Sequence, residues 1–401
     1  MSRRVRVLTI VTRFQAGAGA VALRGAQGLD PDRFEVRFLV GRGDRLIEEA
    51  ARAGFDIRVE PTLRHHIAPR DEVRALRRIS DLLRREHVDV VHTHSAKAGM
   101  IGRMAARQAR VPRIVHTYHG FPFHEFQSPL KRAVFVDIER HLGRFTDVGL
   151  CVGSGVAVEA VRRRLIAPER VRTIEVAVDD DTATPRTPAS RVTARARLGL
   201  PANAAVVGAV GRLAYQKAPE DFVRALSLSS TPGVMGVWIG SGEREALVRR
   251  AIERARPEVP VILAGERSDV SELLPALDVF ALPSRYEGVP VAIVEAMRAG
   301  VPVVATAVNA VSDVVVPGVS GLLVPPQEPG MLADAIDHLL ADPGLARAMA
   351  GEAQRRLAGR YDTASLGSTL TAAYRPSEPR PTSVSIRPRT RAVVEGSSRA
   401  R

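Results

Sequence analysis

The stretch that decides the fold of this chain is residues 281–305, ALPSRYEGVPVAIVEAMRAGVPVVA. An apolar run ends at residue 282, and a loop that contains Gly and Pro follows it. Residues 291–299 then space their apolar side chains as a helix does, and residues 303–305 form a second apolar run. Two strands joined through a helix are the unit of a parallel sheet, because parallel neighbours need a long crossover connection. The stretch therefore predicts an α/β protein.

The same alternation of strand-like and helix-like runs extends over most of the chain. The strand-like runs are nearly continuous in apolar residues, which is typical of parallel sheets covered by helices on both faces. The alternation stops at residues 179–190, DDDTATPRTPAS, where acidic, Pro and Thr residues without an apolar period indicate a linker. We therefore predict two doubly wound, Rossmann-like domains that face one another across a cleft.

The domain boundaries follow from this break. The predicted parts are a first domain at 1–178, the linker at 179–190, a second domain at 191–360, a terminal helix at 361–375 that crosses back to the first domain, and a disordered basic tail at 376–401. The tail is rich in Pro, Ser, Thr and Arg and is too poor in apolar residues to bury a core. Ligands of doubly wound sheets bind at the carboxyl ends of the strands, so we expect a site between the domains.

The composition argues against several classes of protein. Aromatic residues make up only 4% of the 401 residues, which disfavours a nucleic-acid binder that stacks on bases. The single cysteine, Cys151, cannot form an intrachain disulfide, so a reducing cytoplasm is the expected location. The first apolar run is too short for a signal peptide, and the longest later run is about half of a membrane span. We expect a cytoplasmic protein that can also lie peripherally on the inner face of the plasma membrane.

Positive charge concentrates in the first half of the chain. Residues 1–175 carry 32 Lys and Arg against 20 Asp and Glu, within a net charge of +14. A basic half suits an anionic partner, such as a lipid surface, a lipid pyrophosphate or a phosphorylated acceptor. Helix-like residues 70–86 place apolar side chains on one face and arginines elsewhere, which fits an anionic membrane surface. Arginines spread over solvated faces, and an apolar face packed into the core, explain these patterns equally well.

Two cations follow a predicted strand of the second domain. The segment 208–217, GAVGRLAYQK, places Arg212 and Lys217 in the loop before a helix. Arg can grip two phosphate oxygens in a fork, and Lys supplies a compact positive charge. The pair therefore suits a diphosphate, although ordinary loop cations would give the same pattern.

Two glutamates stand in the stretch quoted first. Glu287 lies at the tip of the loop, where a carboxylate can reach the hydroxyls of a sugar. Glu295 lies on a largely apolar helix face and needs a partner, which the hydroxyls of a ribose would supply. The start of the helix offers main-chain amides and a helix dipole to an anion. The residues expected there are Gly288, Val289, Pro290 and Val291. A capping Glu and a satisfied helix Glu are the structural alternatives.

Histidines gather in the segments 90–99 (VVHTHSAKAG) and 115–124 (VHTYHGFPFH). His119 follows a predicted strand and precedes a Gly, which places it at the edge of the cleft. A neutral imidazole there can accept from a hydroxyl or donate to a reacting oxygen. A metal cluster is the rival interpretation, but the spacing has neither an HExxH pattern nor Cys pairs. We expect no metal, with His94 at the end of a strand and Lys97 as a cation that contacts acceptor or phosphate.

These motifs resemble those of the retaining glycosyltransferases of family four, which have the GT-B fold. Residues 208–326 match the carboxyl-terminal domain of that family, with GRL-x-x-x-K, the two glutamates, AGVPVVAT and GLLVPP in order. Residues 265–269, GERSD, resemble the family loop that recognises the nucleobase, which nominates Arg267. The resemblance implies that Arg212 and Lys217 bind the donor diphosphate, Glu287 the donor sugar and Glu295 the ribose.

The first half resembles family members that build exopolysaccharide and lipid-linked glycans. The resemblance implies that His119 contacts the transferring sugar. The loop at 14–19, FQAGAG, resembles the glycine-rich loop that approaches donor and acceptor in the family, with Gly17 and Gly19 split by an Ala.

Together these features predict a hexosyltransferase. It would move a hexose or N-acetylhexosamine, with retention, from a UDP-linked or other nucleotide diphosphate sugar to a lipid-linked or polysaccharide acceptor. The catalytic residues expected are His119, Arg212, Lys217 and Glu287, with the cations stabilising charge on the leaving phosphate. The acceptor contacts expected are His94, Lys97 and His119, and no metal or other cofactor is required. Transfer to a soluble acceptor such as inositol phosphate, and a non-catalytic nucleotide-sugar-binding subunit, are the alternatives.

Overall fold

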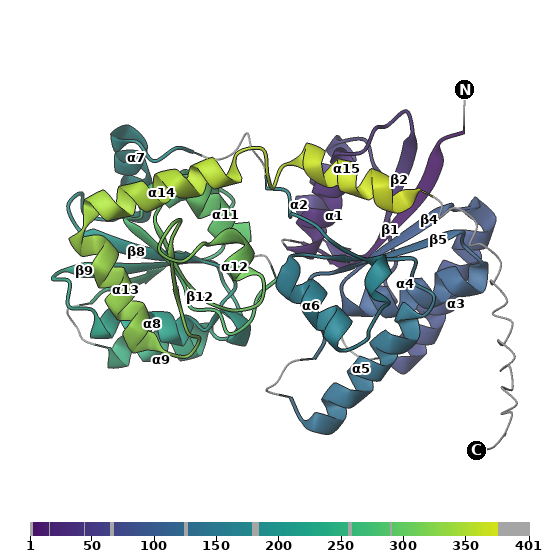
Figure 1. Ribbon diagram of the computed structural model, residues 1–401, viewed down its shortest axis with the longest axis horizontal. Helices are drawn as coiled ribbons and strands as arrows, with labels where there is room; N and C mark the ends of the chain where they lie inside the picture. Colours follow the sequence, from purple (N-terminus) through teal and green to yellow (C-terminus); the bar gives the residue numbers. More distant parts are fainter. Residues whose placement is uncertain are drawn as a thin grey trace, which may run out of the picture.

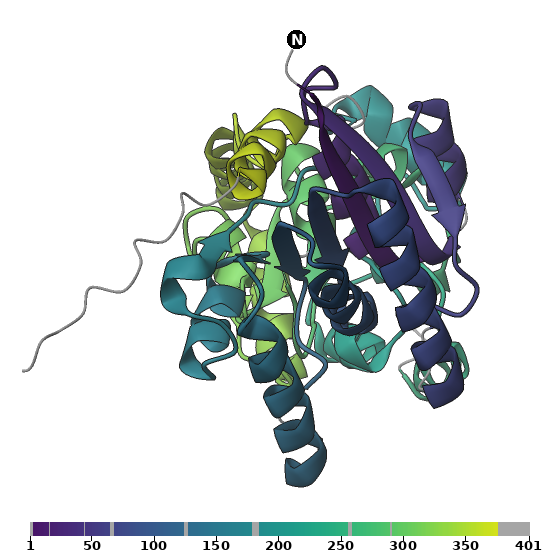
Figure 2. The same cartoon turned by 90° about the vertical axis from the view of Figure 1, so that its right-hand side faces the viewer.

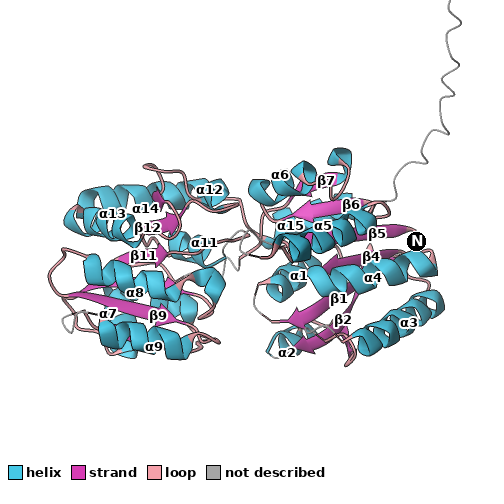
Figure 3. Cartoon of the chain, turned by 90° about the horizontal axis from the view of Figure 1, so that it is seen from below, coloured by secondary structure: helices cyan, strands magenta, loops and turns pink. Residues whose placement is uncertain are grey.

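The structure is a computed structural model that describes residues 3–15, 17–43, 45–64, 68–123, 127–178, 184–255, 259–288 and 291–375. The predicted tail at 376–401 and the predicted donor contacts Val289 and Pro290 lie outside the described residues. Figure 1 shows two domains, each with a central sheet between layers of helices. Figure 3 shows the same layers from below, with helices along both faces of each sheet. The predicted fold of two doubly wound domains is confirmed.

The first domain has a seven-stranded parallel sheet in the order β3-β2-β1-β4-β5-β6-β7. Its strands are β1 (Val5–Phe14), β2 (Phe34–Gly43), β3 (Asp56–Val59), β4 (Val90–His94), β5 (Arg113–Tyr118), β6 (Val148–Cys151) and β7 (Val171–Thr173). Its helices are α1 (Ala18–Gln27), α2 (Arg45–Arg52), α3 (Pro69–Glu86), α4 (Ala96–Ala109), α5 (Pro129–Gly143), α6 (Ser154–Arg162) and the short 3-10 helix η1 (Pro168–Arg170).

The second domain has a six-stranded parallel sheet in the order β10-β9-β8-β11-β12-β13. Its strands are β8 (Ala205–Val210), β9 (Val234–Ile239), β10 (Val261–Leu263), β11 (Val279–Leu282), β12 (Val303–Thr306) and β13 (Leu322–Val324). Its helices are α7 (Pro188–Leu198), α8 (Pro219–Leu228), α9 (Glu245–Arg254), α10 (Val270–Leu273), α11 (Val291–Arg298), α12 (Val311–Val314), α13 (Pro329–Ala341) and α14 (Pro343–Leu357), with 3-10 helices η3 (Tyr215–Lys217) and η4 (Leu274–Ala276).

Burial on both faces explains why the strands are almost entirely apolar. In β1, Leu8 and Ile10 pack with α3 and α4, whereas Val11 packs with α1 and α2 on the other face. The same packing decides whether the apolar face of α3 meets a membrane or the core. Its Ile79 and Leu83 are buried in the core, so the apolar face predicted there packs against the sheet and α4.

Each sheet reverses its strand order once, and the predicted site residues follow the strands at these points. In the first sheet the order reverses between β1 and β4, and in the second between β8 and β11. Such reversals open a crevice at the carboxyl ends of the strands, where ligands bind. Gly17 and His94 lie at the first reversal, and Arg212 and Ser284 lie at the second.

The helix α15 (Thr363–Tyr374) follows α14 of the second domain but packs on α1 of the first (Figure 1). The two helices come close at a pair of glycines. A Cβ at Gly28 would lie 2.1 Å from the carbonyl oxygen of Thr363, and one at Gly367 would lie 1.9 Å from that of Gly28. Leu370 of α15 is buried at the same contact.

The carboxyl-terminal boundary predicted for the linker at 179–190 is wrong, because α7 already begins at Pro188. Thr187 caps this helix: its Oγ1 accepts from the main-chain N–H of Ser190, and the Ser190 hydroxyl accepts from the N–H of Thr187. Thr before Pro is a helix start signal, which the surrounding Pro and Thr residues obscure.

Candidate active site

A cluster of polar side chains joins the loops that follow β8 and β11. Lys217 places Nζ 2.5 Å from Oε1 of the buried Glu287. The same carboxylate accepts from the hydroxyl of Ser284 at 2.6 Å and from Nε2 of Gln216 at 3.2 Å. The main-chain N–H of Glu287 donates to Oδ1 of Asn309 at 3.1 Å. Two residues predicted to bind different parts of the donor therefore hold one another in the structure.

Arg212 follows β8 and is exposed beside this cluster. Burial raises the pKa of the Tyr286 hydroxyl, and the charge of Arg212 acts against that rise. Arg212 also acts electrostatically on Arg13 of the first domain. Neighbouring Arg285 is engaged in another way, because its guanidinium lies over the ring of Tyr215 at 4.4 Å. Arg212 therefore lies within electrostatic reach of the first domain, and its contact with the donor diphosphate stays a prediction.

Glu295 lies in the second turn of α11 and is partly exposed. The residues on either side of it, Val294 and Ala296, are fully buried in the core. A carboxylate on the rim of an otherwise buried helix matches the environment predicted for it. Its contact with ribose stays a prediction, as do the anion contacts of the amides from Gly288 to Val291.

Arg267, nominated for the donor site, lies in the loop after β10. Its guanidinium forks onto the carboxylate of Asp269, with contacts of 2.8 and 2.7 Å. This hydrogen bonding raises the pKa of Arg267 and lowers that of Asp269. The side chain is therefore engaged inside its own loop, and its contact with the donor stays a prediction.

The histidines of the first domain form a line of contacts at the carboxyl ends of β4 and β5. Nδ1 of His94 lies 2.9 Å from Nε2 of His119. The ring of His92 packs on that of His94, with centroids 4.2 Å apart. His92 bonds through Nδ1 to the hydroxyl of Tyr374 and through Nε2 to that of Thr117, both at 2.7 Å. The line therefore runs from α15 through β4 to the domain junction.

Burial keeps these imidazoles neutral. Desolvation lowers the pKa of His119 to about 4 and that of His92 to about 3. Burial is also the main cause that lowers the pKa of His94 and of His116 well below the ordinary value. A neutral pair shares one proton in the bond between His94 and His119, so Nδ1 is the nitrogen of His119 that remains for a substrate. Within the described part of the chain, Nε2 of His94 is buried without a hydrogen-bond partner.

The donor loop and His119 meet where the domains touch. A Cβ on Gly288 would lie 2.7 Å from the carbonyl oxygen of His119 and 2.9 Å from Cγ2 of Val152, so a side chain would not fit there. A second contact joins the start of α6 to α12, because the N–H and hydroxyl of Ser154 both donate to the carboxylate of Asp313. The carboxyl ends of the two sheets thus bring the predicted groups of both domains together.

Two of the predicted contacts are already used by the fold. Lys97, in the first turn of α4, lies 2.8 Å from Oε1 of Glu72 in α3, which balances its charge inside the domain. Gly19 lies within α1, where a Cβ would sit 2.9 Å from the main chain of Phe14. Gly17 is exposed at the N-cap of α1 with a φ of 73°, a conformation that favours Gly. Gly19 therefore serves the packing of α1 on β1, and the donor contacts of Gly17 and Gly19 both stay predictions.

Four residues of the site are absent from the sequence-based prediction. Gln216 directly precedes Lys217, and Ser284 lies three residues before Glu287. Their nearness in sequence to these predicted residues could have identified them as part of the site. Asn309 has a φ of 45°, and nothing in the sequence links it to Glu287. Tyr374 reaches His92 across 282 positions of sequence, and only the return of α15 to the first domain reveals that contact.

The part of the chain that the structure describes contains no group of three or more His, Cys, Asp or Glu side chains arranged to hold a metal ion. Arg212 and Lys217 contribute positive charge to the site. The expectation that the reaction needs no metal stays a prediction.

Family models match both halves of the chain. A model of group 1 glycosyl transferases matches residues 190–356, and a model of glycosyltransferase family 4 matches residues 16–182. The chain is 30% identical over 302 residues to UDP-Gal:alpha-D-GlcNAc-diphosphoundecaprenol alpha-1,3-galactosyltransferase of Escherichia coli, covering 73% of this chain and 77% of that protein. It is 34% identical over 272 residues to D-inositol 3-phosphate glycosyltransferase of Mycobacterium tuberculosis (strain ATCC 25177 / H37Ra), covering 63% of this chain and about half, 54%, of that relative.

Solved structures share the fold at low sequence identity. Anabaena Alr3699/HepE in complex with UDP-glucose superposes with a TM-score of 0.77 at 22% identity, over 92% of this chain and 99% of that one. WaaG, a glycosyltransferase involved in lipopolysaccharide biosynthesis, gives a TM-score of 0.73 at 19% identity, over 92% and 98% of the two chains.

The fold, the polar cluster at the second sheet and these matches define one class of protein, the GT-B glycosyltransferases. Within that class, the chain belongs to glycosyltransferase family 4 and is a hexosyltransferase. The family resemblance drawn from the sequence motifs is thereby confirmed.

Proposed function

We propose that the protein transfers a hexose or N-acetylhexosamine, with retention, from a UDP-sugar to a lipid-linked acceptor that carries a diphosphate. The observation that carries this proposal is the match to the Escherichia coli galactosyltransferase over about three quarters of both chains, since its name specifies a UDP donor and a GlcNAc-diphosphoundecaprenol acceptor. The ion pair of Lys217 and Glu287 at the candidate donor site supports an active enzyme over a non-catalytic sugar-nucleotide-binding subunit.

The mechanism proposed uses the polar cluster as it stands. Lys217 exchanges part of its contact with Glu287 for an oxygen of the donor diphosphate, and Arg212 contacts the same group from the other side of the loop. Fixed cations and amides then stabilise the charge that develops on the leaving phosphate, and stabilisation of this kind supplies much of the rate enhancement of many enzymes. Glu287, held by Ser284 and Gln216, is left to orient the hydroxyls of the sugar.

His119 is proposed to meet the transferring sugar through Nδ1. Nε2 of His94 has no partner among the described residues, and a buried lone pair without a partner is tolerated better than a buried N–H without one. The proton of the pair is therefore assigned to Nδ1 of His94, which donates to Nε2 of His119. In this arrangement Nδ1 of His119 carries its own proton and donates to a sugar or acceptor oxygen.

We expect transfer from one UDP-sugar to a short-chain lipid that carries GlcNAc diphosphate. The assay supplies the purified protein with a panel of UDP-, GDP- and ADP-sugars, and offers inositol phosphate as the second acceptor. Product is detected by mass spectrometry, and the anomeric configuration by NMR. The inositol-phosphate acceptor has its own support in the mycobacterial relative.

The outcomes of this assay separate the candidates. Transfer to inositol phosphate with none to the lipid would move the assignment to a soluble acceptor. Neither transfer nor hydrolysis with any donor would leave the non-catalytic subunit as the better interpretation. A lipid-linked product places the enzyme in the assembly of exopolysaccharide or a related glycan, on the cytoplasmic side of the membrane.

We further propose that the first domain binds an anionic membrane surface through α4 and α5, rather than through α3. None of the described helices is long and apolar enough to span a bilayer. Leu130 and Val134 of α5 are 77% and 51% exposed, and Met104 of α4 is 37% exposed. A shallow groove of about 430 Å³ separates the two helices here. Lys131 and Arg132 stand beside this apolar surface, and α5 projects from the domain in Figures 1 and 2.

Flotation with liposomes tests this surface. Wild-type protein is expected to float with vesicles that contain anionic lipid and to stay at the bottom with neutral vesicles, because binding combines apolar insertion with charge attraction. Leu130→Gln combined with Val134→Gln should abolish flotation. Val192→Gln is the matched control, since this valine of the second domain is 65% exposed. Flotation that survives the double substitution would contradict the assignment to α5.

A further inference from the structure

Two arginines lie side by side at the carboxyl ends of β1 and β2. Arg13 and Arg42 are direct partners in the register of these parallel strands, so their side chains leave the same face of the sheet. Both side chains are exposed. Among the described residues, no hydrogen bond or ion pair holds either guanidinium. The charges of Arg212 and Arg42 disfavour the protonated form of Arg13, whereas that of Glu243 favours it. An anion placed between Arg13 and Arg42 would reduce the repulsion between them.

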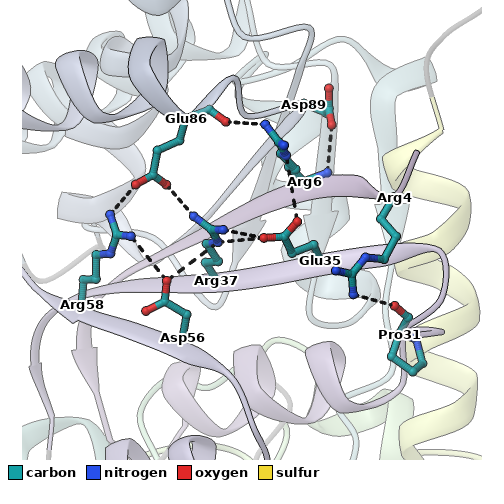
Figure 4. A network of polar contacts seen from close by, with 9 residues as sticks. All are labelled: Arg4, Arg6, Pro31, Glu35, Arg37, Asp56, Arg58, Glu86 and Asp89. Carbon is teal, nitrogen blue, oxygen red and sulfur yellow. Dashed lines mark hydrogen bonds and ion pairs between the residues drawn. The ribbon is translucent and has the colours of Figure 1, made fainter.

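The opposite end of the same strands shows how this chain treats arginines that have a structural role (Figure 4). There, Arg37 contacts Glu35 at 2.5 Å and Glu86 at 3.1 Å. Arg58 pairs with the same Glu86 and, at 3.5 Å, with Asp56. Arg37 and Arg58 are thus matched to carboxylates, whereas Arg13 and Arg42 form no ion pair among the described residues.

The unmatched pair lies close to the reaction centre. Val11 of β1 pairs in register with His94 of β4, and Arg13 follows two residues later. His94 contacts His119, which follows β5. Arg13 is therefore two strands away from the strand of His119, or about 10 Å at the usual strand spacing. That separation suits a sugar that reacts beside His119 and carries its phosphate toward β1.

The second domain faces the same pair. Arg212 and Glu243 act on the pKa of Arg13 in opposite directions, so Arg13 lies within electrostatic reach of the second domain. Lys217 and Arg212 already provide two cations for the donor diphosphate on the other side of this junction. Cations from the first domain are additional to these, and they stand on the side where the acceptor binds.

We propose that Arg13 and Arg42 form a binding site for the phosphate or diphosphate group of the acceptor. Paired guanidinium groups match a phosphate through forked, charge-assisted hydrogen bonds. The chemistry is the same for a lipid-linked sugar diphosphate and for a soluble phosphorylated polyol. This inference rests on the proposed function, since it names the acceptor as a phosphorylated molecule. It also assigns a use to part of the positive charge of the first domain.

The test compares Arg13→Gln, Arg42→Gln and the double substitution with wild type. Each single change is expected to raise KM for a phosphorylated acceptor about 10- to 100-fold, the range for loss of a hydrogen bond to a charged group. KM for the donor and the rate of donor hydrolysis without acceptor should not change. Acceptors that lack the phosphate, such as an alkyl N-acetylglucosaminide or free inositol, should respond little. Arg77→Gln is the matched control, because Arg77 is exposed and its helix α3 lies away from the junction.

The other results have defined meanings. A raised donor KM, with slower donor hydrolysis, would assign the arginines to the donor and overturn the inference while leaving glycosyl transfer intact. Equal losses with phosphorylated and unphosphorylated acceptors would also overturn it. If wild type transfers nothing, the proposed function fails, and titration of inorganic diphosphate into UDP-saturated protein decides the inference by itself. Binding that is lost in the double variant supports the anion site, and unchanged binding rejects it.

Discussion

Substitution of Lys217 by Ala is expected to lower the turnover of donor by roughly 10²- to 10³-fold, the usual loss when one preorganised group that stabilises developing charge is removed. The expectation rests on the position of Nζ, which lies in the loop after β8 and 2.5 Å from Glu287. The effect should fall on kcat more than on KM, because charge on the leaving phosphate develops in the transition state. Transfer and donor hydrolysis, measured separately, check it.

Glu287→Gln tests whether Lys217 and Glu287 act as one unit. Because they share a contact, the losses in the double variant should be smaller than the product of the single losses. Glu295→Ala is expected to raise KM for the donor through the lost ribose contact. Lys131→Ala on α5 is the matched control, and with a water-soluble acceptor it should behave as wild type. Near-normal transfer by both Lys217→Ala and Glu295→Ala would remove the donor site from this part of the molecule.

Acid is expected to destabilise the protein steeply between about pH 6.5 and pH 4. The pKa of His119 falls from 6.5 to about 4 and that of His92 to about 3 in the folded state, because burial penalises the charged imidazole. His94 and His116 shift in the same direction. In this range the unfolded chain binds protons at these sites and the folded chain does not, so stability is full above pH 6.5 and falls as the pH falls.

The expected loss is large for a protein of ordinary stability. His119 and His92 each cost about 1.4 kcal/mol of stability for every pH unit below 6.5, until the pH reaches the folded-state pKa. Together they would remove a substantial part of the roughly 5–15 kcal/mol that stabilises a typical native protein, and His94 and His116 act in the same direction. Urea unfolding at pH 7.5, 6.5, 5.5 and 4.5 measures the slope of the free energy of unfolding against pH.

Two variants show whether the slope belongs to the buried histidines. His119→Asn should reduce the slope by about one proton, because one titrating group is removed. His141→Gln should keep the wild-type slope, since His141 lies on the exposed side of α5. A free energy of unfolding that stays flat from pH 7.5 to pH 5 would show that these imidazoles are not buried as a neutral group.

Local sequence carries more information about the candidate donor half of the site than about the acceptor half. The residues predicted to meet the donor lie in two loops and at the start of a helix. In chain order they are Arg212 and Lys217 for the diphosphate, Glu287 for the sugar and Glu295 for the ribose. Their motifs are short and follow β8 and β11, which are adjacent in the sheet. The sequence pattern alone is therefore enough to predict that these residues lie close together. Lys97 shows the opposite case, because its partner Glu72 lies on another helix and no local pattern announces the ion pair.

The contacts that bury the histidines could not be inferred from the sequence around them. The pattern placed His119 at a strand end, where the structure has it. The pattern did not reveal that His94 supports it, or that Tyr374 closes the line from a helix at the far end of the chain. Such contacts depend on the return of α15 to the first domain, and that return depends on the fit of Gly28 against Gly367.

The sequence by itself determined the two doubly wound domains and the family, and it nominated the groups expected to meet the donor. It could do so because apolar periodicity and short loop motifs are local properties of the chain. Only the tertiary structure decided which cations form ion pairs inside the protein. Arg37, Arg58 and Lys97 are matched to carboxylates brought from elsewhere in the chain, whereas Arg13 and Arg42 have no such match among the described residues. The balance of a charge depends on neighbours that are distant in sequence, and the stretch at 281–305 carries no information about them.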